Sequence, residues 1–335
     1  MKIVSTVALT PAQRKLLLAA APGAEVADRQ CGSVEEMTAM VRAGCEVLMT
    51  FRVPENVGRL SPRLRWIHLL TAGADQVMKE PSEYRSLLVT TSSGIHSAAI
   101  AQYTLGSILT YVHRFHLTAR AQSNRTWLRR QPFMDNVREL RGATIGIVGY
   151  GSLGREIARL AQAFGMRVLA LKRVPQQHTD TGWSLAGTGD PQGLLPEQFF
   201  GPEERAEMLA RSDFVVVTLP QTPHTRHFIG AREFTAIKAG AYLVNVGRGD
   251  VIDQEAMIAA LREGRLGGVG LDVFEREPLE PESPLWEFEH AILTPHIAGS
   301  FRGYVERACE LLAENLRRFV AGEPLLNQVN IALGY

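Results

Sequence analysis

A glycine-rich turn near the middle of the chain has the residue types and spacing to hold a phosphate group. The apolar run Ala143–Val148 leads into it, and the helical pattern Arg155–Phe164 follows. The turn reads Gly149, Tyr150, Gly151, Ser152, Leu153 and Gly154. Glycines so spaced permit a tight turn, close approach of the backbone to a pyrophosphate, and close packing of helix on strand. The helix N-terminus adds free amides. We therefore predict a dinucleotide-binding turn, with a turn in another kind of βαβ unit as the alternative.

A basic pair follows the next apolar run. Lys172 and Arg173 come directly after Arg167–Leu171, about where a dinucleotide-binding unit usually has an Asp or Glu. That carboxylate would bind the ribose hydroxyls and would repel a 2′-phosphate. The basic pair removes this repulsion and supplies cationic donors, so it predicts a preference for NADP. The alternative is a solvated basic strand end, with NAD bound through other contacts.

Polar side chains also follow three later apolar runs. Arg248 lies in "YLVNVGRGDVID", His296 lies in "ILTPHIAGS", and "GVGLDVFEREPL" carries Asp272, Glu275 and Glu277. Because open α/β sheets bind ligands at the carboxyl ends of their strands, we expect the three segments at one crevice. A planar Arg suits a carboxylate, and a His beside an acid suits proton transfer near neutral pH. Taken singly, each residue could equally be structural.

Short apolar runs alternate with helical patterns along nearly the whole chain, which favours an α/β protein with parallel sheets. Several runs are apolar throughout, as in strands covered on both faces. Besides the strand before the glycine turn, the predicted strands are Lys2–Thr6, Cys45–Thr50, Arg65–Leu70, Leu87–Thr91, Arg167–Leu171, Phe214–Leu219, Ala241–Val246, Gly268–Val273 and Ala291–Thr294.

Two long helical patterns, at about residues 97–123 and 304–320, flank the second series of strands. We predict two Rossmann-like or flavodoxin-like parallel-sheet domains joined by these long crossing helices. One domain would comprise residues 1–98 plus 300–335, and the other residues 99–299. The stretch from residue 174 to about 202 is rich in Gly, Pro, Gln and Thr, which predicts an insertion loop.

The composition excludes several function classes. The chain has 335 residues, enough for two cores, and a formal net charge of +1 gives no general drive toward nucleic acid or anionic lipid. No apolar run is long enough to span a bilayer. The three cysteines form neither metal-ligand spacing nor an even disulfide set, so we expect no metal and a reducing cytoplasm.

Four motifs occur together in this chain: the glycine turn, N-x-x-R-G, L-D-V-F-E-x-E-P and T-P-H-x-A-G. With them the chain resembles the D-isomer-specific 2-hydroxyacid dehydrogenase family over nearly its whole length. "SPLW" and the tail "LLNQVNIALGY" are also similar to this family. The resemblance implies a discontinuous substrate-binding domain, a Rossmann domain, and a nicotinamide cofactor, with NADP preferred and NAD possible.

The resemblance also implies roles for the polar residues. Arg248 would bind the carboxylate and carbonyl of the substrate, and His296 would protonate the carbonyl oxygen. Glu277 would pair with His296, and Glu275 is the competing acid. Asp272 would lie near the nicotinamide amide.

Further loops take part in the family's sites. The remaining cofactor-binding residues implied by the resemblance are Pro220, Thr225, Val246, Gly247 and Gly299. In "LLTAGADQV", the small residues Ala72, Gly73 and Ala74 let backbone amides point at an anion, and in the family this loop binds the substrate carboxylate. An ordinary turn is the alternative there. The arm at residues 125–133 corresponds to a dimer surface, so a homodimer is expected.

The function implied is NAD(P)-dependent reduction of a small 2-oxo acid such as glyoxylate or hydroxypyruvate. One alternative is a non-catalytic, dinucleotide-sensing protein of the corepressor kind, since fold alone does not fix function. Another is a phosphite or formate dehydrogenase of the same superfamily. Formate dehydrogenases have Gln where this chain has Glu277, which disfavours formate.

Overall fold

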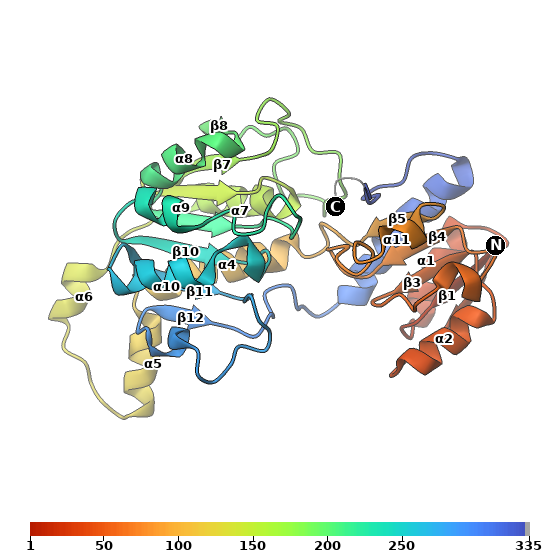
Figure 1. Cartoon of the computed structure of the whole chain (residues 1–335), viewed down its shortest axis with the longest axis horizontal. Coiled ribbons are helices and arrows are strands. Elements are labelled where there is room, and N and C mark those ends of the chain that lie inside the picture. The colour runs from red at the N-terminus through yellow and green to blue at the C-terminus, as the bar shows by residue number, and fades with distance from the viewer. Residues whose placement is uncertain (332–335) are drawn as a thin grey trace. The chain divides into compact units, whose positions relative to one another are not determined.

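The chain forms two compact units in the computed structural model, which describes residues 1–331 and only the backbone of Asp135 and Asn136. Unit 1 comprises Met1–Ile95, Thr181–Trp183 and Phe301–Tyr335, of which residues 332–335 lie outside the described part. Unit 2 comprises His96–Asp180 and Ser184–Ser300. Figure 1 shows the elements of both units.

Unit 1 is built on a five-stranded parallel sheet with the order β2-β1-β3-β4-β5, the flavodoxin-like order. Its strands are β1 (Lys2–Ser5), β2 (Glu25–Asp28), β3 (Val47–Thr50), β4 (Trp66–Leu69) and β5 (Leu88–Thr91). Its helices are α1 (Pro11–Ala20), α2 (Val34–Arg42), α3 (Val57–Leu60), α11 (Tyr304–Ala321) and the 3₁₀ helix Pro81–Tyr84.

Side chains of unit 1 alternate between the two faces of its sheet. Ile3, Val47 and Trp66 pack with residues of α1 and α11, whereas Val4 and Ile67 pack on the opposite face with residues of α2 and α3. Because helices cover both faces, the central strands β3 and β4 are buried along their whole length. All three cysteines lie in unit 1: Cys45 and Cys309 are buried and Cys31 is half-buried.

Unit 2 has a seven-stranded parallel sheet with the order β12-β11-β10-β9-β6-β7-β8. Its strands are β6 (Thr144–Val148), β7 (Arg167–Leu171), β8 (Gln198–Phe200), β9 (Phe214–Val217), β10 (Ala241–Asn245), β11 (Leu266–Leu271) and β12 (Ala291–Leu293). Its helices are α4 (Ser97–Val112), α5 (Phe115–Ser123), α6 (Gln131–Asn136), α7 (Ser152–Ala163), α8 (Arg205–Arg211), α9 (Ala231–Ala236), α10 (Gln254–Arg262) and the 3₁₀ helices Pro202–Glu204, Gly249–Val251 and Pro284–Glu287.

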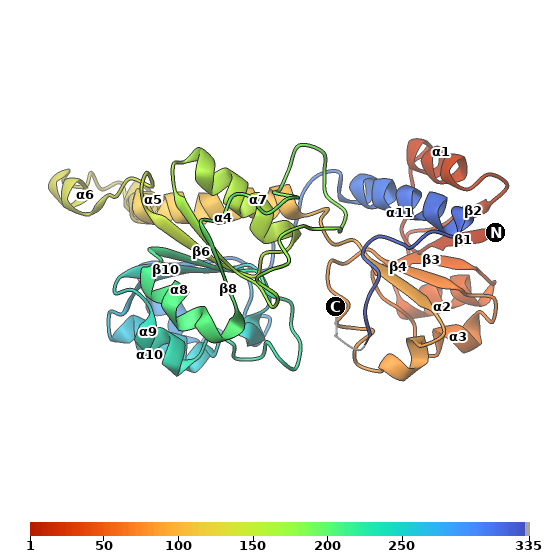
Figure 2. The ribbon, with the colours of Figure 1, turned by 90° about the horizontal axis from the view of Figure 1, so that it is seen from above.

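Helices cover both faces of this second sheet as well. Ile145 and Val168 pack with residues of α4 and α7, while Leu169 and Val215 pack with residues of α8, α9 and α10. Figure 2 shows these two helix layers on opposite sides of the sheet. The prediction of two parallel-sheet α/β domains is therefore confirmed.

The structure differs from the sequence-based expectation in several places. The predicted helix at 97–123 is two helices, because Arg114 between α4 and α5 has a left-handed φ of 58°. Strands β2 and β8 were not predicted. The units divide at Ile95/His96 and Ser300/Phe301, and residues 181–183 belong to unit 1. We call residues 174–197, which precede β8, the insertion segment.

None of the helices in the described part of the chain is long and apolar enough to cross a membrane.

Candidate active site

The strand order of unit 2 reverses at β6, which lies between β7 and β9. Open α/β sheets bind their ligands at such a switch point, outside the carboxyl ends of the strands. The predicted glycine turn directly follows β6. The residues Arg248, Asp272 and His296 follow β10, β11 and β12, which are neighbours in the sheet. The structure therefore brings the predicted segments of unit 2 to one edge.

The three glycines of the turn meet three different constraints. Gly149 has a φ of +106°, which a side chain rarely adopts. A Cβ on Gly154 would lie 2.3 Å from the carbonyl oxygen of Gly149, so only glycine lets α7 pack this closely. A Cβ on Gly151 would meet no heavy atom within 4 Å, so it would project into open space beside the turn. This open cradle fits a dinucleotide whose pyrophosphate approaches the backbone at Gly151.

The other turn residues divide between ligand-facing and structural positions. Ser152 and Leu153 open α7, and the first amides of a helix have no acceptor within the helix. Tyr150 instead is 3% exposed, and its Oη donates to Oδ2 of Asp190 at 2.7 Å. The side chain of Tyr150 is thus part of the core under the insertion segment.

The basic pair follows β7, as predicted from the sequence. The Nζ of Lys172 donates to the carbonyl oxygen of Gln177 in the insertion segment. Burial and the nearby Arg155 lower the pKa of Lys172, and Asp180 opposes this shift. Arg173 is exposed. Lys172 is therefore held by its own loop, and Arg173 is the more accessible cation of the pair.

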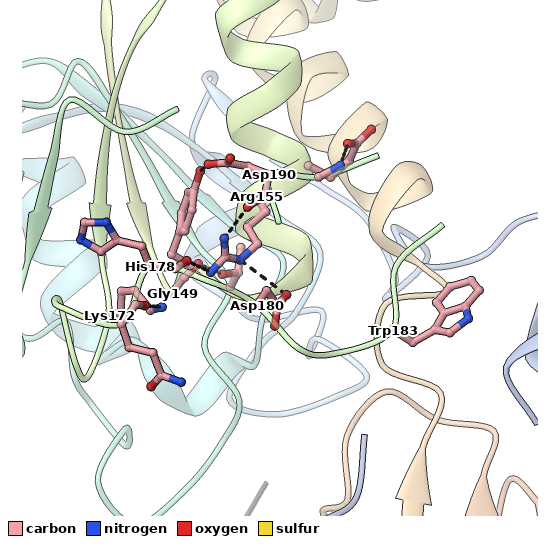
Figure 3. A network of polar contacts seen from close by, with 12 residues as sticks. Gly149, Arg155, Lys172, His178, Asp180, Trp183 and Asp190 are labelled. Atoms are coloured by element: carbon pink, nitrogen blue, oxygen red, sulfur yellow. Dashed lines mark hydrogen bonds and ion pairs between the residues drawn. The ribbon is translucent and has the colours of Figure 1, made fainter. Parts of the chain in front are cut away.

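Arg155, directly after the glycine turn, holds the insertion segment from within. The side chain is 2% exposed. Its Nη2 donates to the carbonyl of His178 at 2.6 Å, and its Nη1 donates to the carbonyl of Asp190. Its Nε lies 3.5 Å from Oδ2 of Asp180, and its guanidinium carbon lies 4.9 Å from the centre of the Tyr150 ring. Figure 3 shows the guanidinium among these groups.

Two further carboxylates fix the same segment. Oε2 of Glu156, which is 2% exposed, accepts from the amide of Gly189 at 2.6 Å. The Asp190 carboxylate accepts from the amides of Leu194 and Leu195 at 2.9 and 3.0 Å. The predicted insertion loop is therefore a hydrogen-bonded structure anchored on the first turn of α7. Sequence reasoning missed Arg155 and Glu156, since nothing in the pattern marks a charged helix residue as buried.

The loops after β9 and β10 pack closely together. Oγ1 of Thr225 donates to the carbonyl of Pro220 at 2.6 Å. Val246 is buried, and a Cβ on Gly247 would lie 2.6 Å from the carbonyl oxygen of Leu219. These predicted cofactor-binding residues therefore lie at strand ends beside the glycine turn in the sheet order.

Arg248 is held in place by the asparagine of the N-x-x-R-G motif. Asn245 is 1% exposed. Its Oδ1 accepts from the amide of Gly247 at 3.1 Å, and its Nδ2 donates to the carbonyl of Arg248 at 3.0 Å. The guanidinium of Arg248 donates from Nη1 to the Gly247 carbonyl at 2.9 Å, and the residue is half-buried. The main chain that carries this cation is therefore fixed by a buried side chain.

His296 and Glu277 are in direct contact. Nδ1 of His296 lies 2.7 Å from Oε2 of Glu277, and Oε1 of Glu277 accepts from the amide of Phe274 at 3.1 Å. A carboxylate only accepts hydrogen bonds, so Nδ1 carries the proton in this pair. Nε2 is the remaining ring nitrogen, and the His296 side chain is 51% exposed. This arrangement suits a histidine that exchanges a proton with a ligand through Nε2.

The competing acid, Glu275, has other partners. Its Oε1 lies 3.1 Å from Nε2 of His227 and accepts from the amide of Gln254 at 3.0 Å. Glu277 is therefore the acid that the structure places on His296.

Two more predicted cofactor-binding residues border the His296 segment. Asp272 is 2% exposed, and its carboxylate accepts hydrogen bonds from this segment. A Cβ on Gly299 would lie 3.2 Å from Cδ2 of His96, so the backbone there approaches α4 closely.

The predicted substrate loop belongs to unit 1, where it follows β4. Ala72 is exposed, Gly73 is half-buried and Ala74 is buried. Oγ1 of Thr71 donates to the carbonyl of Gly73 at 2.7 Å, which tightens the turn.

Within the residues that the structure describes, no cluster of three or more His, Cys, Asp or Glu side chains could hold a metal ion. A doubly wound sheet, a glycine turn at its switch point and a histidine–carboxylate pair at a nearby strand end together define a dinucleotide-dependent dehydrogenase.

The NAD binding domain of D-isomer specific 2-hydroxyacid dehydrogenases matches residues 105–298. The chain is 34% identical over 289 residues to a glyoxylate reductase of Aeropyrum pernix, covering 84% of this chain and 81% of that protein. It is 36% identical over 280 residues to a glyoxylate reductase of Thermococcus gammatolerans, covering 82% and 79%. The chain belongs to the D-isomer-specific 2-hydroxyacid dehydrogenase family, and it is an NAD(P)-dependent oxidoreductase.

Solved structures agree with this assignment. A D-isomer specific 2-hydroxyacid dehydrogenase of Xanthobacter autotrophicus in complex with NADPH and MES is 31% identical, with a TM-score of 0.78 over 100% of this chain and 99% of that one. An NADPH-dependent glyoxylate/hydroxypyruvate reductase of Sinorhizobium meliloti in complex with NADP and sulfate is 25% identical, with a TM-score of 0.77 over 100% and 99%. The family predicted from the motifs is thus confirmed.

Proposed function

We propose that this protein is an NADPH-preferring reductase of small 2-oxo acids, with glyoxylate and hydroxypyruvate as the favoured substrates. The observation that carries the proposal is the 2.7 Å contact between Nδ1 of His296 and Oε2 of Glu277. It leaves Nε2 of the half-exposed His296 to give a proton to a ligand. The similar proteins named as glyoxylate reductases support the substrate class.

The bound cofactor would supply a hydride to the carbonyl carbon of the substrate. The protein's own residues would complete the reaction. His296, protonated at both ring nitrogens, gives its Nε2 proton to the carbonyl oxygen, which yields the 2-hydroxy acid. Glu277 holds the ring by its Nδ1 proton.

We assign Arg248 to the substrate carboxylate. A guanidinium offers a planar pair of donors that matches a carboxylate. Arg248 follows β10, two strands from the strand that precedes His296. We assign residues 72–74 and unit 1 to substrate binding, and unit 2 to cofactor binding.

The preference for NADPH rests on the residues after β7. No carboxylate follows Leu171 directly, and Lys172 and Arg173 offer cationic donors to a 2′-phosphate. Two of the similar structures contain NADPH or NADP, which supports the same preference. Gly151 and the first amides of α7 would contact the pyrophosphate. The loops after β9, β10 and β11 would contact the rest of the cofactor.

The test is a spectrophotometric assay of cofactor oxidation with glyoxylate and hydroxypyruvate, comparing NADPH with NADH. Rapid oxidation of NADPH and slow oxidation of NADH is the expected result. Equal use of NADH would retain the reductase and overturn the cofactor preference. Binding of NADPH without turnover of any 2-oxo acid would favour a dinucleotide-sensing protein, and turnover of phosphite alone would change the substrate class.

We further propose that two copies of the chain associate through the region of α5 and α6. Figure 1 shows these helices extending from the body of unit 2. Large apolar side chains are exposed there: Phe115 at 54%, Trp127 at 97% and Met134 at 63%. Exposed apolar groups in one region mark a protein interface. Light scattering on the peak eluted from a size-exclusion column should give a dimer mass, and Trp127→Glu should shift this mass toward that of the monomer.

We also propose a cytoplasmic localisation. The three cysteines are free thiols, which fits a reducing compartment.

A further inference from the structure

One buried carboxylate gathers the segment that carries His296. Oδ1 of Asp272 accepts from the amide of Ile297 at 2.8 Å, and Oδ2 accepts from the amide of Ala298 at 2.8 Å. The carbonyl of Asp272 also accepts from the amide of His296 at 2.9 Å. Three successive amides of the chain thus point at one residue of the neighbouring strand end. His296 has a left-handed φ of 55°, a conformation that needs support from its surroundings.

A second route reaches the same carboxylate from α4. Oη of Tyr103 lies 2.6 Å from Oγ1 of Thr294, and Oγ1 of Thr294 donates to Oδ1 of Asp272 at 2.6 Å. A hydroxyl has one proton to donate, and Thr294 gives it to the carboxylate. Tyr103 must therefore donate to Thr294. Burial raises the pKa of Tyr103 to about 12, so the phenol keeps that proton at neutral pH.

We propose that Tyr103, Thr294 and Asp272 form a hydrogen-bonded brace that positions the His296 imidazole for proton transfer. All three residues and His296 belong to unit 2. Tyr103 and Thr294 are positioning residues, because they act through Asp272 and the backbone rather than by touching a reactant. The brace fixes the direction of the chain on both sides of His296, while Glu277 fixes only the tilt of the ring.

The brace also explains why Asp272 is buried as an anion. A buried carboxylate is tolerated when donors satisfy its oxygens. Asp272 receives one hydroxyl and two amides, and a carboxylate has about four acceptor sites. One acceptor site therefore remains for a further donor. The order of donors makes the chain Tyr103 to Thr294 to Asp272 one-directional, so removal of either hydroxyl weakens the hold on the segment.

The inference rests on the proposed reductase activity, and its test is a set of single variants. Thr294→Val removes the hydroxyl at nearly constant volume, and we expect kcat with the 2-oxo acid to fall about 10- to 100-fold. Tyr103→Phe should lower kcat about 3- to 10-fold. The KM for NADPH should stay within about twofold in both, since hydrogen bonds to the His296 segment are lost rather than contacts at the glycine turn. Thr294→Ser, which keeps the hydroxyl, should recover most of kcat.

Tyr242→Phe is the matched control. Tyr242 is fully buried in the same unit, and its Oη lies 2.9 Å from Oγ of Ser107, which is also on α4. This variant removes a hydroxyl contact to the same helix but leaves the brace intact, so kcat should stay within about twofold. A kcat loss in Tyr103→Phe no larger than in Tyr242→Phe, or no recovery in Thr294→Ser, would overturn the brace.

Amide hydrogen exchange separates this inference from the proposed function. The peptide covering residues 294–300 should exchange faster in Thr294→Val and Tyr103→Phe than in the unchanged protein, and Tyr242→Phe should not alter it. This readout needs no turnover. Absence of activity in the unchanged protein would therefore refute the reductase alone, whereas unaltered exchange in both brace variants would refute the brace alone.

Discussion

Two irregular segments are each organised by one buried charged side chain of unit 2, and the charges have opposite signs. The His296 segment is built on Asp272, which accepts backbone amides. The insertion segment is built on Arg155, which donates to backbone carbonyls. Each side chain is 2% exposed. Irregular backbone has unpaired amides and carbonyls, and a buried ion can satisfy several of them at once.

The difference lies in what each segment presents. The segment on Asp272 is short and carries a half-exposed histidine, so its exact shape matters to a reacting ligand. The segment on Arg155 is long and carries Gln177, whose carbonyl binds Lys172 at the predicted cofactor edge. We therefore expect the segment built on Asp272 to serve proton transfer and the segment built on Arg155 to serve cofactor choice.

The largest effect on kcat should follow from replacing His296, whose segment Asp272 holds. His296→Gln should lower kcat about 100- to 10,000-fold, because the proton donor is lost. NADPH binding, measured by quenching of tryptophan fluorescence, should remain. A variant that retained turnover within tenfold would show that another group donates the proton.

The two buried ions can be compared directly by isosteric or near-isosteric replacement. Asp272→Asn removes acceptor capacity beside two amides, and Arg155→Met removes a cation that holds two carbonyls. Each should lower the free energy of unfolding by about 3–5 kcal/mol, because partners are left buried and unpaired. Urea unfolding measures this. Only Asp272→Asn should also lower kcat; an equal loss of kcat in Arg155→Met would remove the division of roles.

The choice between NADPH and NADH should depend on the basic pair after β7, which the insertion segment contacts through Lys172. Arg173→Gln should lower the ratio of kcat/KM for NADPH to that for NADH about 10- to 100-fold, since a hydrogen-bonded ion pair with the 2′-phosphate is lost. Arg167→Gln is the control, because Arg167 begins the same strand and pairs with Glu197 at its exposed end. An equal change in both variants would mean that general charge, rather than a phosphate contact, sets the ratio.

A buried ionisable group without a charge gives the smallest expected effect near neutral pH. His68 in unit 1 is fully buried between the hydroxyls of Thr90 and Ser92, and burial lowers its pKa from 6.5 to about 3. The unfolded chain binds this proton first as the pH falls. Stability should therefore decline below pH 6.5, by at most about 1.4 kcal/mol per pH unit from this group. In His68→Gln the pH dependence of the urea midpoint should be shallower between these values; an unchanged slope would contradict the assignment.

The sequence predicted the parts of the molecule that depend on local patterns. The glycine turn and the three polar segments could be predicted to lie at strand ends, because the run before each of them is apolar and its end marks the end of a strand. Strand β2 was missed because its residues are only partly buried at a sheet edge, and β8 because three residues in a Gly- and Pro-rich stretch make no pattern. No Gly or Pro marks the break at Arg114.

The contacts of the site required the structure. The spacing of Glu275 and Glu277 fits either acid to His296, and only the folded chain gives Glu275 to His227. The buried Arg155 contacts Asp190, which lies 35 positions further along the chain. The link from Tyr103 to Asp272 joins residues 169 positions apart. Sequence periodicity reports which face of an element is buried, and it does not report which distant polar groups meet there.

The cysteines allow the opening of unit 1 to be followed by thiol labelling. All three thiols lie there, and none lies in unit 2. Burial raises the pKa of Cys309 to about 12 and also raises that of Cys45, so a thiol reagent will reach them as reactive thiolates only when unit 1 opens. The half-buried Cys31 supplies the fast reference reaction in the same molecule. The labelling rates of the unsubstituted chain therefore report the opening of unit 1 and do not report that of unit 2.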